Sequence, residues 1–561
     1  MFSTSRSLKT TAALGLLFAT STLAADVSNL LGSQQVYGST ECKTVTIGNP
    51  YRTCYDIHTK TGLTFPQLSS YNPGLNCATL QLGQKVCISS GVLPSRALAP
   101  NPDGSCVKYT VPAGATCAQI ADKFNATISQ IESWNAGTYK WRGCALLQLG
   151  YTLCVSPGSP PPIPVNQKLQ CGPASPGNAT CPLNACCSAF GYCGVTPEFC
   201  EPATNGEPCI SNCRQPTLPS CPTSQLQRKV GYFAGWINRA KCDQFWSKQV
   251  NPTHYTHIIY AFATFGRDMK ITLSNQDIEQ LKDLVSRKET TRMSIGVGGW
   301  TFSQEGQARS LFTDMISTSA NRATFIQSVQ SFISQYQLDG IDIDMEYPAS
   351  IERHGPPTDT PNLTAFFTEL RAALPNNLEI SMATPSGYWF LKGFELDKVA
   401  PLVSFINMMS YDYHGSWDAT INSTNSSALP HTSLEDIKDS ALLYTRAGIN
   451  MSKINLGLAS YGRTYALADP NCNGYGCRMT GSGSPGECSD AGGFLSYSEI
   501  RRLAKNTTVH YDQTSQTKWM KNGRDLITFD DQDTWAVKKE FAANTCFGGT
   551  MLWNIEGVDI L

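Results

Sequence analysis

Three acidic residues alternate along one short apolar segment of the chain. In Asp339-Gly-Ile-Asp-Ile-Asp-Met-Glu346, the acids Asp342, Asp344 and Glu346 are spaced two residues apart. On a β-strand, alternate side chains share a face and are separated by roughly 6.5–7 Å, so the three carboxyl groups should lie close together. Crowded carboxyl groups repel one another, and at least one should keep a proton near neutral pH. Glu346, at the end of the segment, is therefore a candidate general acid.

The acidic segment is the fourth of eight apolar segments that have the pattern of strands, with longer helical patterns between them. The eight are Val230–Trp236, Thr256–Phe262, Met293–Val297, Leu338–Tyr347, Leu378–Met382, Phe405–Tyr411, Ile454–Leu458 and Gly549–Trp553. This alternation predicts an α/β fold, a (β/α)₈ TIM barrel over residues 229–561. We expect Ile341, Ile343 and Met345 to face the helices, and the three acids, at the alternate positions, to point into the barrel. Alternating acids usually mark a solvated strand face, but that interpretation does not fit here, because the inside of such a barrel is packed.

Two features depart from a simple barrel. The segment between the last two strands is much longer than the others, which predicts an inserted α+β domain at about residues 463–545 that forms one wall of a groove. Few residues follow the last strand, so either the sequence is truncated or another element covers the face where an eighth helix would lie. Uncovered apolar surface there would cost stability.

Residues 42–155 contain an internal repeat of about 50 residues. Each copy has four cysteines in similar spacing, an aromatic-Asn-x-Gly step and a Leu-Gln-Leu-Gly step, and a strand-like start precedes a helical pattern such as Cys117–Phe124. The copies, 42–88 and 106–155, resemble LysM modules, which bind N-acetylglucosamine polymers. The first copy lacks the usual tyrosine and glycine-aspartate turn. The alternative is a disulfide-stapled spacer without a ligand.

A proline-rich segment, 156–170, is typical of a stiff linker and leads to eight cysteines within residues 171–213. Such a short segment needs disulfides because it cannot bury a sufficient core. Its adjacent cysteine pair and its Ser-x-aromatic-Gly-aromatic-Cys pattern resemble a hevein-type chitin-binding domain. The resemblance implies a sugar site formed by Ser188, Phe190, Tyr192 and Phe199. The alternative is that these aromatic rings form the small core of the module.

The acidic segment also resembles the Asp-x-x-Asp-x-Asp-x-Glu signature of family 18 glycoside hydrolases. Further motifs stand in the family's order: Ser294–Trp300, Met409–Asp412, Tyr461–Arg463 and Met551–Trp553. The resemblance covers residues 229–561. It implies hydrolysis of chitin by a retaining mechanism in which the substrate's own acetamide group is the nucleophile.

The same resemblance implies a role for each residue of the site. Glu346 would protonate the glycosidic oxygen, and Asp344 would hydrogen-bond the acetamide N–H and stabilise the positive charge. Asp342 would share a proton with Asp344, while Tyr411 would orient the acetamide carbonyl and Asp412 would help to bind the same sugar. The other substrate-binding candidates are Trp553 beneath the sugar ring, and Trp300, Tyr232, Phe262, Met409, Tyr461 and Arg463 in neighbouring subsites. We expect neither a metal nor an organic cofactor.

Net charge, the N-terminal segment and the cysteine count indicate the cellular compartment and exclude some classes of binding partner. The 561 residues carry a formal net charge of −1, without the basic face that nucleic acids require. Residues 1–24 have a basic start and an apolar run of roughly a dozen residues, which predicts a signal peptide and is too short for a membrane span. The 22 cysteines agree with secretion. Seven Asn-x-Ser/Thr sequons are compatible with a glycoprotein: Asn125, Asn178, Asn362, Asn422, Asn425, Asn450 and Asn506.

The function that these patterns favour is that of a secreted chitinase, endo- or exo-acting, that is extracellular or associated with a cell wall. The module combination resembles fungal chitinases related to the chitinase-like subunit of yeast killer toxins. We expect a monomer whose partners are chitin and chito-oligosaccharides, with no nucleic acid and no membrane span. The alternative is a catalytically inactive chitin-binding effector or lectin, although such relatives usually lose the general acid. An enzyme for the chitobiose core of N-glycans is disfavoured by the two kinds of chitin module.

Overall fold

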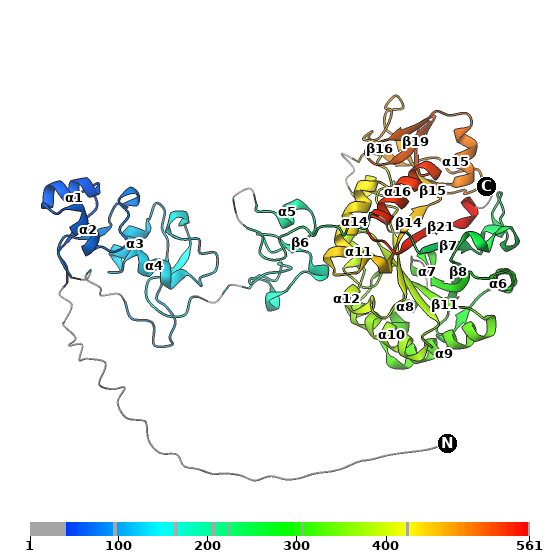
Figure 1. Ribbon diagram of the computed structural model, residues 1–561, viewed down its shortest axis with the longest axis horizontal. Helices are drawn as coiled ribbons and strands as arrows, with labels where there is room; N and C mark the ends of the chain where they lie inside the picture. Colours follow the sequence, from blue (N-terminus) through cyan, green and yellow to red (C-terminus); the bar gives the residue numbers. More distant parts are fainter. Residues whose placement is uncertain are drawn as a thin grey trace, which may run out of the picture. The chain divides into compact units, whose positions relative to one another are not determined.

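The computed structural model describes residues 41–91, 93, 98–161, 163, 165–203, 206, 208–222, 225–304, 308–421 and 426–558 (Figure 1). The predicted signal peptide lies outside these residues. The chain divides into two units, Met1–Pro164 and Val165–Leu561, which are described separately. Within the described ranges, no helix is both long enough and apolar enough to cross a membrane.

Both repeats of the first unit fold as a pair of antiparallel strands with two helices. The first copy contains β1 (Thr44–Thr46), α1 (Cys54–Thr61), α2 (Phe65–Tyr71) and β2 (Lys85–Cys87). The second contains β3 (Lys108–Thr110), α3 (Cys117–Lys123), α4 (Ile128–Asn135) and β4 (Thr152–Cys154). In each copy the first cysteine bonds to the fourth and the second to the third: Cys42–Cys87 and Cys54–Cys77, then Cys106–Cys154 and Cys117–Cys144.

The four α-helices in the described part of this unit begin in the same way. A threonine caps each one and accepts a hydrogen bond from the backbone of the residue three positions on, whose side chain returns the bond: Thr53, Thr64, Thr116 and Thr127. Such capping boxes satisfy the amides that a helix start leaves unpaired. They explain why helices of only seven or eight residues form in modules with little core.

The second unit starts with the cysteine-rich module. It contains a short 3₁₀ helix η4 (Pro182–Asn184), the strands β5 (Cys186–Cys187) and β6 (Cys193–Gly194), and α5 (Pro197–Cys200). Its disulfides are Cys171–Cys187, Cys181–Cys193, Cys186–Cys200 and Cys209–Cys213.

Eight parallel strands close into a barrel, as predicted. They are β7 (Arg228–Ala234), β8 (His257–Phe265), β10 (Arg292–Gly298), β11 (Gly340–Asp344), β12 (Glu379–Pro385), β13 (Phe405–Met409), β14 (Ile454–Ala459) and β21 (Gly549–Trp553). The pairing of β21 with β7 and of β8 with β10 completes the circle. Ile341, Ile343 and Met345 are buried in the outer core, which confirms that this side of β11 faces the helices.

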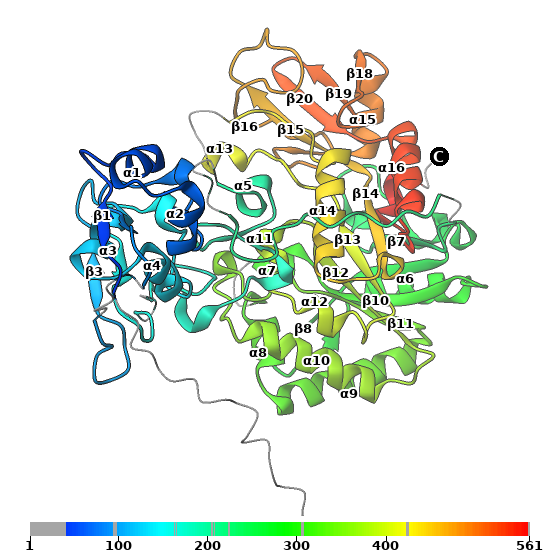
Figure 2. The same ribbon diagram turned by 60° about the vertical axis from the view of Figure 1, so that its left-hand side comes forward.

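Helices surround the barrel in Figures 1 and 2: α6 (Asn275–Ser286), α9 (Ser319–Tyr336), α10 (Asp359–Ala373), α12 (Leu396–Val399), α14 (Leu434–Arg446) and α16 (Gln532–Asn544). Near β21 and β7, other segments supply apolar cover. Ile555, just after β21, is fully buried in the barrel core. Leu218 and Leu226, from the segment before β7, pack against the same core. The disulfide Cys221–Cys546 fixes that segment to the chain before β21.

The insertion between β14 and α16 contains a six-stranded antiparallel sheet. Its strands are β15 (Tyr461–Leu467), β16 (Met479–Ser482), β17 (Phe494–Ser496), β18 (Val509–Asp512), β19 (Thr517–Asn522) and β20 (Asp525–Phe529), accompanied by α15 (Tyr497–Ala504). The range expected for the insertion, about 463–545, also includes α16. This helix contacts the barrel strands β14 and β21 and thus belongs to the barrel. Cys242–Cys488 bonds the insertion to the loop after β7.

Candidate active site

Asp342 lies inside the barrel and is fully buried. Its carboxylate accepts hydrogen bonds from Tyr232 Oη at 2.8 Å, Ser381 Oγ at 2.6 Å and Asn407 Nδ2 at 3.3 Å. Burial raises the pKa of Asp342 to about 6, although these three donors oppose the rise. Because all three groups donate, they favour the charged form of this carboxyl group.

Asp344 and Glu346 follow on the same face and are 4% and 6% exposed. Among the described residues, Asp344 Oδ1 has no hydrogen-bond partner. Burial, and then the charges of Glu346 and Asp342, raise the pKa of Asp344 well above its usual value. Burial raises the pKa of Glu346 to about 7, against a hydrogen bond from Tyr347 and the charge of Arg353. Near neutral pH, Glu346 can therefore hold a proton and release it, as a general acid requires.

Asp412, just beyond β13, has the opposite character. Arg463 on β15 binds its two oxygens in a fork, from Nε at 2.8 Å and from Nη2 at 2.6 Å. Although burial alone would raise the pKa of Asp412, the charge and hydrogen bonds of Arg463, together with the nearby imidazole of His431, lower it. The site therefore pairs carboxyl groups that keep protons with one that stays ionised, a separation typical of acid–base sites.

His431 was not among the expected site residues. It is fully buried, with Nδ1 3.5 Å from Asp412 Oδ1 and its ring 5.0 Å from that of Tyr461. Burial lowers its pKa, so the ring is neutral beside the carboxylate. No motif marks this histidine, since it lies in a loop before α14.

An aromatic cluster fills the barrel next to the acids. Phe262, Met409, Tyr411 and Trp553 are its partly buried members, and Tyr232 is a buried one. The rings of Phe262 and Trp553 stack at 5.6 Å, and Tyr232 meets Trp553 edge-on at 5.5 Å. The Tyr232 hydroxyl donates its hydrogen bond to Asp342, so Tyr232 positions this acid from within the barrel.

Tyr411 and Tyr461 continue the lining. Tyr411 Oη lies 3.9 Å from Met551 Sδ, and the ring meets that of Tyr461 edge-on at 5.9 Å. Burial, and then the charge of Asp344, raise the pKa of Tyr411 well above its usual value, so its hydroxyl keeps its proton as a donor. Trp300 is 54% exposed, with the Arg353 guanidinium 4.6 Å from the ring centroid.

Sequence reasoning missed other exposed tryptophans at this end of the barrel. Trp236 follows β7 and stacks with Phe262 at 6.2 Å; Trp417 follows β13, with Arg463 5.1 Å from its ring; Trp389 follows β12. Each lies soon after the carboxyl end of a barrel strand, where active sites of this fold are built. A search for tryptophans at those positions would have found them.

On the cysteine-rich module, the four predicted residues line one hollow of about 470 Å³, together with Gln170, Cys193 and Glu198. Phe190 and Tyr192 are 56% and 42% exposed, so they do not form the core of the module. Ser188 is buried, and its Oγ accepts a hydrogen bond from the Tyr192 backbone N–H. Phe199 packs against the cysteine core.

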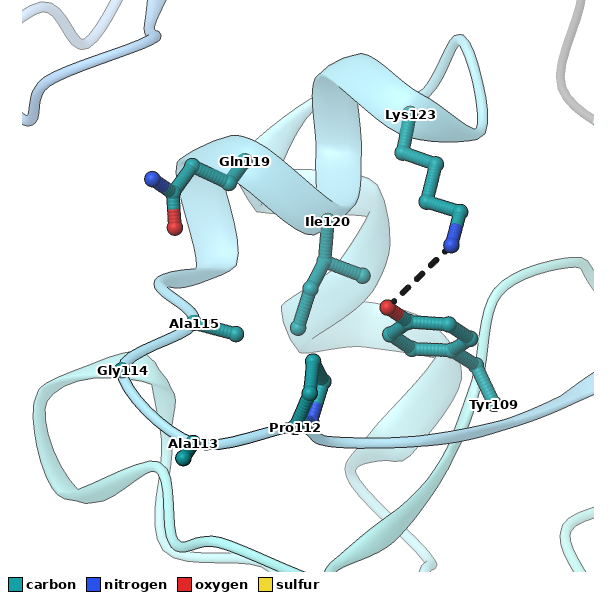
Figure 3. A pocket seen from close by; sticks show the side chains of 8 residues that line it. All are labelled: Tyr109, Pro112, Ala113, Gly114, Ala115, Gln119, Ile120 and Lys123. Atoms are coloured by element: carbon teal, nitrogen blue, oxygen red, sulfur yellow. Dashed lines mark hydrogen bonds between the residues drawn. The ribbon is translucent and has the colours of Figure 1, made fainter.

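The second repeat of the first unit has a hollow of its own, about 280 Å³, that sequence reasoning did not foresee (Figure 3). The turn Pro112–Ala115 forms one side and α3 the other. Lys123 Nζ lies 3.3 Å from Tyr109 Oη and 4.6 Å from the centroid of that ring. The hollow thus combines an aromatic face with polar groups.

Three family models match parts of the chain. The model described as glycosyl hydrolases family 18 matches residues 228–557, that of the chitin recognition protein matches 170–213, and that of the LysM domain matches 44–89 and 109–156. The protein belongs to glycosyl hydrolase family 18. It carries a hevein-type chitin-recognition module and two LysM domains ahead of the barrel.

Similar proteins include fungal ones. Killer toxin subunits alpha/beta of Kluyveromyces lactis are 33% identical over 523 residues, 88% of this chain and 44% of that protein. Secreted chitinase LysM12 of Penicillium expansum is 30% identical over 559 residues, 91% of this chain and 37% of that protein. The chain therefore spans less than half the length of these relatives.

Solved structures share the barrel. The Group IV chitinase of Ostrinia furnacalis is 25% identical, with a TM-score of 0.54, over 59% of this chain and 94% of that one. Human YKL-39, described as a pseudo-chitinase with retained chitooligosaccharide binding properties, is 23% identical with a TM-score of 0.53, over 59% of this chain and 93% of that one. Its likeness shows the fold alone.

Proposed function

We propose that the protein is a secreted chitinase that hydrolyses β-1,4-linked N-acetylglucosamine polymers, in endo or exo fashion. The observation that carries the proposal is the pair Asp344 and Glu346. Glu346 is a buried acid whose pKa is raised to about 7, and the neighbouring Asp344 has a buried oxygen without a partner among the described residues. A proton donor beside an unused acceptor matches what a substrate-assisted glycosidase needs.

In the first step, Glu346 donates its proton to the glycosidic oxygen while the bond from that oxygen to the anomeric carbon breaks. The acetamide carbonyl oxygen of the same sugar attacks the anomeric carbon and forms an oxazolinium ion. Asp344 accepts a hydrogen bond from the acetamide N–H and stabilises the positive charge. Before substrate binds, the three donors on Asp342 favour its ionised form, so the proton that the two aspartates share rests on Asp344. As the acetamide N–H binds, this proton passes to Asp342, and Asp344 becomes the carboxylate that stabilises the positive charge.

In the second step, the Glu346 carboxylate takes a proton from water as the water oxygen attacks the anomeric carbon. The ring of the oxazolinium ion opens, and the product keeps its β configuration. Water and substrate are consumed, and Glu346 ends protonated, as it began.

Sugar binding is assigned to the surrounding aromatic and polar groups. Trp553 would lie under the reacting ring, and Tyr411 would orient the acetamide carbonyl through its protonated hydroxyl. Asp412, held by Arg463, would accept a hydrogen bond from the same sugar. The remaining subsite residues are Trp300, Phe262, Met409 and Tyr461, with Tyr232 acting through Asp342.

The modules would direct the enzyme to its polymer. Phe190 and Tyr192 offer exposed rings beside the hydroxyl of Ser188, and chitin-recognition and LysM models match the chain. Eleven disulfides and a similar protein named a secreted chitinase support an extracellular location. We propose that the enzyme acts as a monomer.

The second candidate function is that of a chitin-binding lectin, because YKL-39, a pseudo-chitinase, shares the fold. Colloidal chitin separates the two. The protein should bind the chitin and release soluble N-acetylglucosamine oligomers from it. Binding without release would favour the lectin.

A further inference from the structure

A buried arginine of the barrel forms several hydrogen bonds with the hevein-type module. Arg446, the last residue of α14, is 8% exposed. Its Nη1 donates to the backbone carbonyls of Asn184 and Asn212 at 3.2 and 2.8 Å, and its Nη2 to the Arg214 carbonyl at 2.8 Å and Gln215 Oε1 at 2.9 Å. Asn184 Nδ2 returns a hydrogen bond to the Arg446 carbonyl at 3.1 Å. A guanidinium with four acceptors fixes orientation as well as distance.

Apolar contacts also join the module to the barrel. Figures 1 and 2 show the module beside α14 and α11 (Tyr388–Leu391). Leu183 packs against the barrel core, and Val195 packs against both that core and the cysteine cluster of the module. Tyr388 likewise touches both. Because buried polar and apolar contacts occur together, the module and the barrel form one body.

The predicted sugar face of the module does not take part in this junction. Phe190 and Tyr192 remain 56% and 42% exposed, and the contacts with Arg446 come from η4 and from residues 212–215. A polymer bound on these rings is therefore held in a fixed relation to the barrel.

Three consecutive residues of α11 connect the module with the acid. Tyr388 touches the cysteine cluster of the module, and Phe390 stacks at 4.5 Å on Tyr347, the residue after Glu346. Between them, Trp389 is 52% exposed. Consecutive Cα atoms are about 3.8 Å apart. Trp389 therefore lies directly between Tyr388, which contacts the module, and Phe390, which contacts Tyr347.

Contacts with neighbouring side chains also hold the Trp389 ring in place. Its Nε1 donates to Glu352 Oε1 at 2.7 Å, and Lys392 Nζ lies 3.7 Å from its ring centroid. The residue after Glu352, Arg353, donates to the Glu346 carbonyl at 3.2 Å and lies over Trp300. A ring held in place but more than half exposed is suited to stacking on a ligand.

We propose that the module and the barrel form a single polymer-binding surface, in which Arg446 fixes the module and Trp389 stacks on a sugar ring lying between the module and the acidic residues of the barrel. The ligand is the N-acetylglucosamine polymer, and the inference rests on the proposed function. Arg446 is a positioning residue, whereas Trp389 touches the polymer outside the reacting sugar.

The test compares initial rates on a soluble N-acetylglucosamine trimer and on colloidal chitin. For Trp389→Ala, the rate on the trimer should stay within about twofold of the parent, while the rate on chitin falls about three- to tenfold through lost stacking. Arg446→Met should show the same split. Trp246→Ala is the matched control, because Trp246 is an exposed tryptophan that directly precedes a 3₁₀ helix, Ser247–Gln249, in contact with α6, and the variant should leave the ratio of the two rates unchanged.

The same variants are also tested for binding to colloidal chitin in pull-down, which does not depend on turnover. Trp389→Ala should bind less than Trp246→Ala. Equal binding and equal rate ratios for these two variants would overturn the proposal, whereas failure of the parent to hydrolyse either substrate would overturn the proposed function alone. Arg446→Lys keeps the charge without the fork, and serves in place of Arg446→Met if that variant does not fold.

Discussion

Four acidic side chains in the barrel differ in proton affinity because of what each one touches. Asp342 is surrounded by donors, Asp344 faces other acids, Glu346 is buried with a single hydroxyl partner, and Asp412 is paired with Arg463. Chemistry that both donates a proton and stabilises a cation needs such a division of roles. In this molecule the division follows from burial and from local partners.

The first prediction concerns pH. Since Glu346 must be protonated to donate, and its pKa is raised to about 7, kcat/KM should fall as pH rises through about 7. In Tyr347→Phe the hydrogen bond that lowers this pKa is lost, so the falling limb should move to higher pH. Rates on a soluble oligomer between pH 5 and pH 9 measure both, with melting temperatures as the control. A flat profile to pH 9 would contradict the assignment of the acid.

The alternation of acids in the sequence was enough to predict which side of β11 faces inward, because the period of a strand is two residues. The partners of Asp342 could not be predicted in the same way. Tyr232, Ser381 and Asn407 come from β7, β12 and β13, and only the register of the closed barrel brings them to one carboxylate. His431 is a similar case, because its partner Asp412 lies on the far side of a loop.

Among the elements, β10 carries a constraint that explains the glycine pair at its carboxyl end. Gly298 has φ +113°, and a Cβ there would lie 2.2 Å from the Asp344 carbonyl oxygen. Gly299 has φ +85°, and its Cβ would lie 2.5 Å from the Phe262 ring. The backbone of β10 therefore approaches the acidic strand more closely than any residue with a side chain allows.

Gly298→Ala should destabilise the protein by about 1–3 kcal/mol, because both the backbone conformation and the space are unfavourable. It should also reduce activity, since the clash is with the backbone of Asp344. Thermal or denaturant unfolding measures the first effect and oligomer hydrolysis the second. Gly387→Ala is the matched control, because nothing lies within 4 Å of its Cβ and its φ is −91°; an equal loss in both variants would refute the explanation.

The eight strands could be predicted because each is a short apolar segment between helical patterns. The junction between α14 and the module could not. Arg446 is one basic residue at a helix end, and three of its acceptors are backbone carbonyls, which leave no trace in a sequence.

In the whole molecule, disulfides join parts that are distant along the chain. Cys221–Cys546 closes a loop with a sequence separation of 325 residues, whereas Cys472–Cys477 has a separation of 5. The long bond restricts the unfolded chain far more than the short one.

Replacing Cys221 and Cys546 by serine should lower the free energy of unfolding by about 2–5 kcal/mol. Replacing Cys472 and Cys477 should cost less. Denaturant unfolding of the two double variants under oxidising conditions provides the comparison. A larger loss from the short loop would show that strain or local packing, and not loop length, governs the effect.

The module should contribute to polymer binding without entering the chemistry. Phe190→Ala combined with Tyr192→Ala removes the two exposed rings of the hollow. Affinity for colloidal chitin should fall about three- to tenfold or more, while trimer hydrolysis stays unchanged. Val165→Ala, which shortens an exposed side chain outside the hollow, should change neither; unchanged chitin affinity in the double variant would exclude the hollow as a sugar site.

The most direct test of the whole account follows the hydrolysis of an N-acetylglucosamine hexamer by proton NMR in the parent and in a folded Glu346→Gln variant. The parent should release products whose new reducing ends are first in the β configuration, and the variant should be slower by about 10²–10⁴-fold. A variant as fast as the parent, or products that first appear in the α configuration, would contradict a protonated Glu346 acting with the substrate's own acetamide.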